Sequence, residues 1–270
     1  MGLELYKSYD KTIDWLRMIA SSSVRTKIFE SLNDGEKDLS QLRDELDLGG
    51  PSILHAIKEL EIGSLVKRTD YGDYALTNIG KVQAILLTDL IKTIAVLSEH
   101  KNFWLTHDIS GIPEELLKET GALNGCKIIR STPTDMFKPF ADFVRVLNES
   151  KKVKAILPIF HEDFPEVIDE LLKKQVSVRL ITNDEILNKA MENNEKLFKE
   201  VSERKNCGIW LNNDIGLIFT VTDKSVAIYL PTSDGRYDYF DELVGDVKES
   251  IVWGDSLFDH YLENSKKVKL

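Results

Sequence analysis

The sequence contains little cysteine: Cys126 and Cys207 are the two cysteines among 270 residues. Two cysteines are too few for a disulfide framework or a four-thiolate zinc site, and these two form no CxxC motif. The five histidines are scattered along the chain without the spacing of metal ligands. We therefore expect reduced thiols and no bound metal.

The chain also lacks a long apolar run. A membrane-spanning helix needs roughly 20 consecutive apolar residues, whereas the most apolar stretch, residues 79–97, contains Lys81, Gln83, Asp89 and Lys92. The first residues have no apolar core of the length that a secretory signal requires. These features predict a cytoplasmic protein without a membrane partner.

Acidic residues outnumber basic ones. The chain has 45 Asp and Glu residues against 35 Lys and Arg residues, which gives a net charge of −10 and a pI near 5.1. This balance excludes a wholly basic nucleic-acid coat protein but leaves room for a local basic patch. A hydrophobic content of 42% and a charged content of 30% are typical of a folded chain, and 270 residues suggest about two domains.

The first third of the chain combines helical and strand patterns on a short scale. We predict helices over residues 23–32, 38–46 and 51–60, and strands over residues 65–68 and 74–77. Asp38 and Gln41 have the spacing of a capping box, and Pro51 suits the first turn of the third helix. Three helices followed by a hairpin predict an α+β winged helix-turn-helix domain over residues 1–78. The alternative is a three-helix bundle that contacts other proteins.

The third predicted helix has two different faces. Ile53, Ile57 and Leu60 form an apolar face, and the opposite face carries polar side chains suited to phosphates and base edges. The DNA-binding candidates are Arg25 in the first helix, Ser52, His55 and Lys58 in the third, and Lys67 and Arg68 in the first strand. Residues 1–78 nonetheless contain ten Lys and Arg residues against fourteen Asp and Glu residues. Because phosphate neutralisation supplies much of the affinity for DNA, we expect specific binding by a dimer, which doubles the contacts.

Residues 78–98 form one long helical pattern that is apolar over most of its circumference. Such a helix must be covered on several sides. We expect it to join the domains and to pair with a second copy of itself, so that residues 79–100 are a linker and dimerisation segment. The alternative is a core helix within a single chain.

Residues 101–270 contain longer alternating strand and helix patterns. We predict strands over residues 126–130, 153–159, 176–181, 208–211, 216–222 and 226–230, and helices over residues 133–149, 165–173, 187–201 and 241–261. This order predicts an α/β sandwich domain, in which a mixed sheet carries helices on its faces.

Three strings give the chain a family resemblance. They are FWLTHDISGIP at residues 103–113, VKAILPIFHEDFPEVIDELLKKQVSVRLIT at residues 153–182 and WGDSLFDHY at residues 253–261. With the pattern of the first third, they resemble the archaeal winged helix-turn-helix regulators that have a methanogenesis-regulatory (FilR-type) C-terminal domain. The resemblance covers about residues 24–261. It implies transcriptional regulation in an archaeon, with double-stranded DNA as partner and a small molecule as effector.

A weaker similarity concerns IGLIFTVTDKSVAIYL at residues 215–230. It resembles the strand-turn-strand of the phospholipase D-like fold, in which His-x-Lys precedes an aspartate. If Asp223 takes the aspartate position, Gly216 and Ile218 take the positions of the histidine and the lysine. A phosphodiesterase cannot form its covalent intermediate without its nucleophile, so the resemblance implies a domain that binds rather than cleaves. The alternative interpretation of Asp223 is a plain hairpin turn.

Three residues are candidates for contacting an effector. Arg130 ends a predicted strand and suits an anion. His161 follows a predicted buried strand, where α/β folds place ligand groups, and Tyr229 is an aromatic candidate on a later strand. We assign no catalytic residue, because the pair His107 and Asp108 lacks a nucleophile in a known motif. A structural role is favoured for this pair, with Asp108 or Ser110 capping the helix that begins near residue 113.

We therefore predict a cytoplasmic, homodimeric transcriptional regulator that is not an enzyme and needs no cofactor. Residues 101–270 are expected to sense the effector. One alternative is a degenerate or divergent phospholipase D-like enzyme, whose activity would depend on His107 or His161. The other is a protein-interaction module whose winged helix does not bind DNA.

Overall fold

The computed structural model describes residues 13, 16–130, 146–193, 199–200, 204–238 and 240–268. The chain divides into two compact units, Met1–Leu90 and Ile91–Leu270. The boundary falls inside one helix, α5 (Asn78–Glu99), which confirms the long helix predicted from the sequence. Ala84 of α5 belongs to the core of the first unit, and Val96 belongs to the core of the second.

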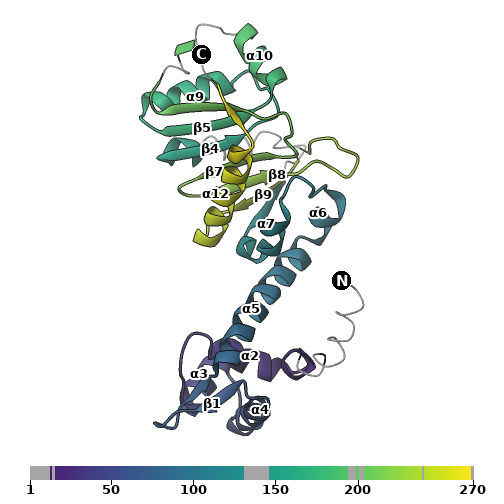
Figure 1. Cartoon of the computed structure of the whole chain (residues 1–270), viewed down its shortest axis with the longest axis vertical. Helices are drawn as coiled ribbons and strands as arrows, with labels where there is room; N and C mark the ends of the chain where they lie inside the picture. The colour runs from purple at the N-terminus through teal and green to yellow at the C-terminus, as the bar shows by residue number, and fades with distance from the viewer. Residues whose placement is uncertain are drawn as a thin grey trace. The chain divides into compact units, whose positions relative to one another are not determined.

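The first unit places the three predicted helices before a hairpin, and residues 16–20 are also helical, which the sequence analysis did not predict (Figure 1). The helices are α2 (Ser23–Ser31), α3 (Leu39–Leu46) and α4 (Gly50–Ile62), and the strands are β1 (Val66–Arg68) and β2 (Tyr74–Leu76). The two strands pair antiparallel, and a bridge from Lys37 to Tyr74 widens the hairpin. This arrangement is consistent with the expected winged helix.

Local signals start and orient the helices of the first unit. The capping box of α3 is confirmed: Asp38 Oδ1 accepts a hydrogen bond from the Gln41 backbone N–H, and the Asp38 N–H donates to Gln41 Oε1, both at 2.8 Å. The apolar face of α4 is buried completely, with Ile53, Ile57 and Leu60 each at most 2% exposed. This burial against α2 and α3 determines which face of α4 remains in solvent.

The first turn of α5 lies close to the residue that precedes β1. A Cβ atom at Gly80 would overlap the carbonyl oxygen of Leu65. This oxygen belongs to the backbone, so it cannot move away by a change of side-chain rotamer. We expect Gly80→Ala to lower the free energy of unfolding by about 1–3 kcal/mol, because overpacking forces the backbone to shift. Urea unfolding followed by circular dichroism measures the change.

Gly49→Ala is the matched control for Gly80→Ala. A Cβ atom at Gly49 would make an ordinary contact, 4.0 Å from Pro51 Cδ. Gly49 has an extended backbone (φ −66°, ψ 138°) that alanine also adopts, so this variant should lose much less stability than Gly80→Ala, because alanine is merely the poorer N-cap residue. Equal stability of the two alanine variants would contradict the steric argument.

The second unit contains a sheet of eight strands among the described residues. The strands are β3 (Lys127–Arg130), β4 (Lys152–Ile156), β5 (Ser177–Thr182), β6 (Cys207–Leu211), β7 (Ile218–Thr222), β8 (Val226–Tyr229), β9 (Asp241–Gly245) and β10 (Lys266–Lys267). Their order is β10-β6-β5-β4-β7-β8-β9-β3. The pairs β4–β5 and β5–β6 are parallel and the other pairs are antiparallel, which confirms the predicted mixed sheet.

Helices pack on this sheet (Figure 1). They are α6 (Lys101–Thr106), α7 (Glu114–Lys118), a 3-10 helix (Thr120–Leu123), α9 (Phe164–Lys173), α10 (Asp184–Asn193) and α12 (Lys248–Glu263). Side chains of a strand alternate between its faces. In β4, Val153 accordingly belongs to the cluster with α9, whereas Ile156 belongs to the cluster with α12. No helix among the described residues is long and apolar enough to cross a membrane.

The last part of the chain differs from the prediction. The single helix expected over residues 241–261 is wrong, because Asp241–Gly245 forms β9 between β8 and β3, and α12 starts at Lys248. Sheet hydrogen bonds on both edges and the burial of Leu243 outweigh the helical pattern of this segment. The helix expected over residues 133–149 lies largely outside the described residues, as does part of the one expected over residues 187–201.

Candidate nucleic-acid interface and effector residues

The solvent face of α4 carries the predicted polar residues. Ser52, His55 and Lys58 are all exposed, three residues apart, and therefore project from one side of the helix. No side chain caps the N-terminus of α4 at Gly49, so the first turn of the helix has no internal anion. The face thus combines a cation, a hydroxyl and an imidazole on a rigidly packed helix, which suits phosphates and base edges.

The hairpin presents the two predicted basic residues on opposite faces. Lys67 and Arg68 are consecutive in β1 and both are exposed. Arg68 donates a hydrogen bond from Nη2 to the Tyr74 hydroxyl at 2.8 Å, and its guanidinium lies 5.2 Å from the centre of the Tyr74 ring. These contacts hold Arg68 in place on the strand, whereas Lys67 extends from the other side.

Arg25 has a different environment from the other candidates. Its side chain is 18% exposed, donates from Nη2 to Ser21 Oγ at 2.9 Å and lies 3.9 Å from a carboxylate oxygen of Glu59 on α4. Because Glu59 and Ser21 already engage the guanidinium, Arg25 supports α4 in this conformation. Its expected phosphate contact stays a prediction.

Two exposed residues near these positions were not among the sequence candidates. Tyr71, in the turn between β1 and β2, is 92% exposed, and Leu54, on the solvent face of α4, is 43% exposed. Both are apolar surfaces beside polar candidates, and a thymine methyl group or a sugar is the chemical partner that fits them. The signal available in the sequence was an aromatic residue in a turn and a leucine outside the apolar stripe of its helix.

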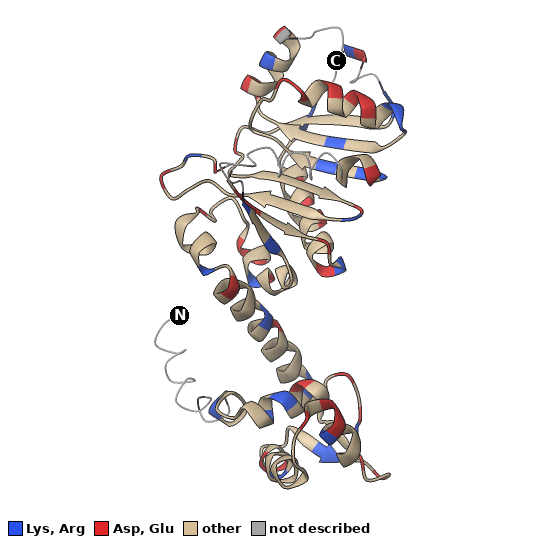
Figure 2. Ribbon diagram, turned by 180° about the vertical axis from the view of Figure 1, so that it is seen from behind, with Lys and Arg blue, Asp and Glu red and all other residues tan. Residues whose placement is uncertain are grey.

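Charges of both signs are distributed over the first unit (Figure 2). Glu59 and Glu61 lie next to Lys58 in sequence, and Asp70 and Asp73 lie in the turn of the hairpin. The first unit of a single chain therefore offers few unopposed cations to a DNA backbone.

The long helix α5 exposes an apolar stripe. Its exposed members are Ile79, Val82, Ile85, Leu86, Leu90, Ile94 and Leu97, each between 40% and 64% exposed. Ile79 and Leu97 are eighteen residues apart, and Leu86 and Leu90 lie between them. Eighteen residues make about five full turns of an α-helix, so Ile79 and Leu97 point in the same direction. The stripe therefore runs parallel to the helix axis. Ala84 and Val96 of the same helix are buried, whereas nothing among the described residues covers this stripe.

The structure places the three candidate effector residues apart. Arg130, at the end of β3, forms a bidentate ion pair with Asp241, with both N–O distances 2.9 Å. Burial and the neighbouring Glu242 carboxylate raise the pKa of the Tyr229 phenol, which therefore stays protonated. His161 lies in the loop after β4, with its side chain 47% exposed and its ring centre 5.4 Å from that of Phe164.

His107 has the contacts of a structural residue. It is 7% exposed, Nδ1 lies 2.8 Å from the Phe103 carbonyl oxygen and Nε2 lies 3.2 Å from Asp238 Oδ2. The expected cap from Asp108 or Ser110 is wrong: α7 begins after Pro113 without a side-chain cap, and Asp108 instead accepts two hydrogen bonds from Ser110. The backbone N–H groups of Leu116 and Leu117 donate to the Pro113 carbonyl oxygen, at 2.9 and 3.0 Å.

The strand-turn-strand at residues 215–230 packs closely against Gly111. The backbone of Gly111 approaches Gly216 so closely that a Cβ at Gly216 would lie 2.9 Å from Gly111 Cα. No catalytic side chain fits at the position where a phospholipase D-like enzyme has its nucleophile. Asp223 occupies the turn between β7 and β8, and its Oδ1 accepts hydrogen bonds from the Lys151 and Lys152 amides at 2.8 and 3.2 Å, which confirms the hairpin-turn interpretation.

Two solved structures are distantly similar to this chain. TrmBL2, described as an archaeal chromatin protein with a novel mode of DNA binding, has a TM-score of 0.44 and 13% identity over 96% of this chain and 99% of that chain. Nuc from Salmonella typhimurium, a phospholipase D family member, has a TM-score of 0.40 and 7% identity over 54% of this chain and 99% of that chain. Scores this low do not decide the fold.

Comparison of sequences is more informative. Residues 13–95 match the family described as Methanogenesis regulatory protein FilR1, N-terminal domain, and residues 136–264 match its middle domain. Methanogenesis regulatory protein FilR1 of Methanothrix harundinacea (strain 6Ac) is 29% identical over 262 residues, which are 94% of this chain and 58% of the relative. The chain thus spans little more than half of that relative's length. These matches confirm the predicted resemblance to archaeal FilR-type regulators: two stretches of the chain match the N-terminal and middle domains of that family.

Proposed function

We propose that this protein is a DNA-binding transcriptional regulator that acts in the cytoplasm as a homodimer and responds to a small-molecule effector. The observation that carries the proposal is the exposed polar face of α4, with Ser52, His55 and Lys58, on a helix whose opposite face is fully buried. The helix would enter the major groove, and the hairpin with Lys67 and Arg68 would contact the backbone beside it. The matches to a family of regulatory proteins support this role.

The exposed stripe of α5 supports the dimer. A second copy of the same helix is the occupant that fits it, because a two-fold axis brings identical apolar residues together and leaves the flanking Lys81 and Lys92 in solvent. Dimerisation also compensates for the small number of basic residues in the first unit, since two half-sites double the number of phosphate contacts. The stripe and the acidic first unit thus point to the same assembly.

Lys58→Ala is the direct test of the α4 interface. We expect the variant to bind a duplex selected from a random-sequence pool about five- to tenfold more weakly, because a single phosphate or base contact contributes on the order of 1 kcal/mol. We also expect the slope of log affinity against log salt to fall by about 1 for each protomer. Fluorescence anisotropy between 50 and 200 mM salt, about the range in which such slopes are resolved, measures both effects.

Lys118→Ala is the matched control for Lys58→Ala. Lys118 is an exposed lysine of the second unit, paired with Glu114 at 2.9 Å, and its removal changes the net charge equally. Equal losses in the two variants would show that only net charge matters and that α4 is not the interface. Failure of the parent protein to select any duplex would instead favour the interaction-module alternative.

The proposal assigns no catalysis to the chain. The middle-domain family is named for a regulatory protein, and Gly216 and Ile218 occupy the positions where the phospholipase D-like resemblance would need a histidine and a lysine. Phosphodiesterase activity that disappears in His107→Ala or His161→Ala would support the enzyme alternative and reject this assignment.

A further inference from the structure

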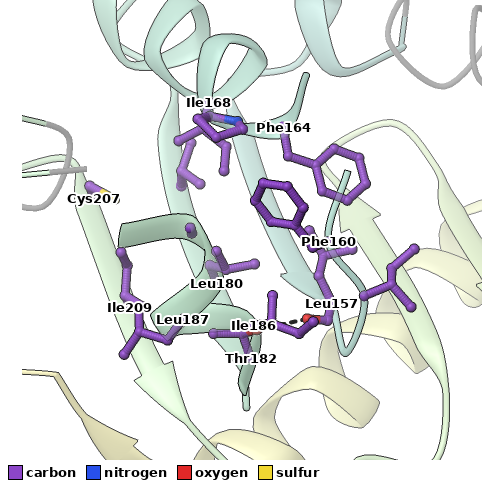
Figure 3. Close-up of a pocket in the computed structure, with 14 residues that line it drawn as sticks. Leu157, Phe160, Phe164, Ile168, Leu180, Thr182, Ile186, Leu187, Cys207 and Ile209 are labelled. Atoms are coloured by element: carbon purple, nitrogen blue, oxygen red, sulfur yellow. Dashed lines mark hydrogen bonds between the residues drawn. The ribbon is translucent and has the colours of Figure 1, made fainter. Parts of the chain in front are cut away.

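The face of the sheet beneath α9 and α10 contains an apolar cavity (Figure 3). Its volume is about 70 Å³, and its lining comes from α9, α10, β5, β6 and the loop after β4. Phe160 and Phe164 lie on one side of the space, and Cys207 and Ile209 lie on the other. The cavity therefore lies between two helices and the sheet rather than in an exposed loop.

The lining offers no polar group to an occupant. None of the described residues that line the cavity is charged, and Thr182 Oγ1 already donates a hydrogen bond to the Leu157 carbonyl oxygen at 2.8 Å. Burial raises the pKa of the Cys207 thiol to about 11, so that it stays neutral. Water molecules need two to four polar partners to remain in a cavity. An apolar occupant is therefore favoured over water.

The position of the cavity also indicates a ligand site. The parallel strands β4 and β5 end beside it, at Ile156 and Thr182, and α/β folds place ligands at the carboxyl ends of parallel strands. The space is partly open to solvent, so a small molecule can enter it.

Polar side chains lie next to the aromatic side of the cavity. His161 follows Phe160 directly in the loop, and the ammonium of Lys189 lies 5.3 Å from the centre of the Phe160 ring. A molecule with an apolar end inside the cavity would keep its polar end near these side chains. His161, a candidate effector residue from the sequence, thus lies beside the cavity, whereas Arg130 and Tyr229 belong to β3 and β8.

We infer that this cavity is the effector site and that it takes the short aliphatic end of an otherwise polar small molecule. The inference rests on the proposed function as a regulator. An aromatic ring such as benzene fits an apolar cavity of about 150 Å³, roughly twice the volume found here. A chain of a few methylene groups, or a small branched alkyl group, is the apolar unit that matches the space.

Methyl NMR spectroscopy of the full chain tests the occupancy, with 1-propanol as probe and 1,3-propanediol as its polar counterpart. We expect saturable shifts from 1-propanol at the methyl groups of Ile168, Leu180 and Ile186, and much weaker ones from the diol. From methanol to 1-propanol, each added methylene should tighten binding about fourfold.

Variants of the lining test the location. Ala190→Leu fills the cavity from α10 and should abolish the saturable shifts, whereas Ala20→Leu, an exposed alanine of the first unit, should leave them unchanged. Ile186→Ala enlarges the cavity and should move the preference toward longer alcohols. Ile186→Ala therefore tests the location even if Ala190→Leu does not fold.

DNA affinity, measured with and without saturating 1-propanol, tests the effector role. We expect a change of at least about fivefold, the lower end of typical coupling between sites, in the parent and in Ala20→Leu but not in Ala190→Leu. Shifts that persist in Ala190→Leu would overturn the site, and saturable binding with unchanged DNA affinity would overturn its role as effector site. A protein that binds no DNA in any state would reject the proposed function, and the effector role with it, while the methyl shifts alone would still show whether the cavity takes an aliphatic chain.

Discussion

Replacing Leu86 and Leu90 of α5 together by aspartate is expected to produce a folded monomer. Both leucines are at least half exposed within one chain, at 64% and 50%, so the change removes little intrachain packing. In the proposed dimer the same positions lie near the middle of the stripe, where four buried carboxylates would face one another without partners. Light scattering at micromolar concentration measures the loss of the dimer.

The same variant should bind its DNA site about 10²–10⁴-fold more weakly than the parent. Linking two binding modules makes the second contact intramolecular, and this advantage disappears when the protomers separate. Anisotropy with a duplex selected by the parent measures the effect, and a duplex with one half-site should show a much smaller difference.

Leu105→Asp is the matched control for the α5 variant. Leu105 is 70% exposed on α6 and undergoes the same chemical change outside the stripe. It should remain dimeric and bind DNA as the parent does. A parent protein that is monomeric at micromolar concentration, or a monomeric variant that binds as tightly as the parent, would refute the dimer.

The second large effect concerns the buried lysine of β4. Lys154 has a side chain that is 6% exposed, and its Nζ lies 2.8 Å from Asp255 and 2.8 Å from Asp259, both on α12. Replacing both aspartates by asparagine leaves this ammonium buried without a counter-charge. We expect the free energy of unfolding to fall by about 3–5 kcal/mol, the cost typical of breaking a buried ion pair from one side.

Adding Lys154→Met to the two asparagine substitutions should restore most of the lost stability. An apolar side chain of similar length removes the charge that has to be desolvated, and such replacements are often neutral. Glu249→Gln with Glu263→Gln is the matched control, because it removes two exposed carboxylates from the same helix. Urea unfolding followed by tryptophan fluorescence measures all three, since Trp104, Trp210 and Trp253 lie in the second unit. A triple variant as unstable as the double one would refute the role of the buried charge.

The ion pairs of Lys154 with Asp255 and Asp259 should also make the free energy of unfolding depend on pH. Burial alone would raise the pKa of Asp255, but hydrogen bonds from Lys152 and Lys154 outweigh it and hold that pKa below its usual value. The unfolded state therefore binds the proton more tightly than the folded state. The contribution of Asp255 is fully present above about pH 4 and is lost as the pH falls through the lower folded pKa. The asparagine variants should lack this part of the acid dependence.

Local patterns in the sequence determined much of this molecule. The capping box of Asp38 and Gln41, the apolar stripe of α4 and the period of α5 each depend on neighbours within a few residues, and the structure has these elements where the sequence predicts them. The opposite faces of α4 follow from the same spacing, so the exposure of Ser52, His55 and Lys58 was predictable as well.

Long-range packing decided the rest. β9 forms because β8 and β3 lie on either side of residues 241–245, although the segment has a helical pattern of its own. Arg25 turns toward Glu59, Gly216 packs against Gly111, and the cavity arises where α9 and α10 cross the sheet. Each of these features joins residues far apart in the chain, and spacing along a sequence carries no information about such distances.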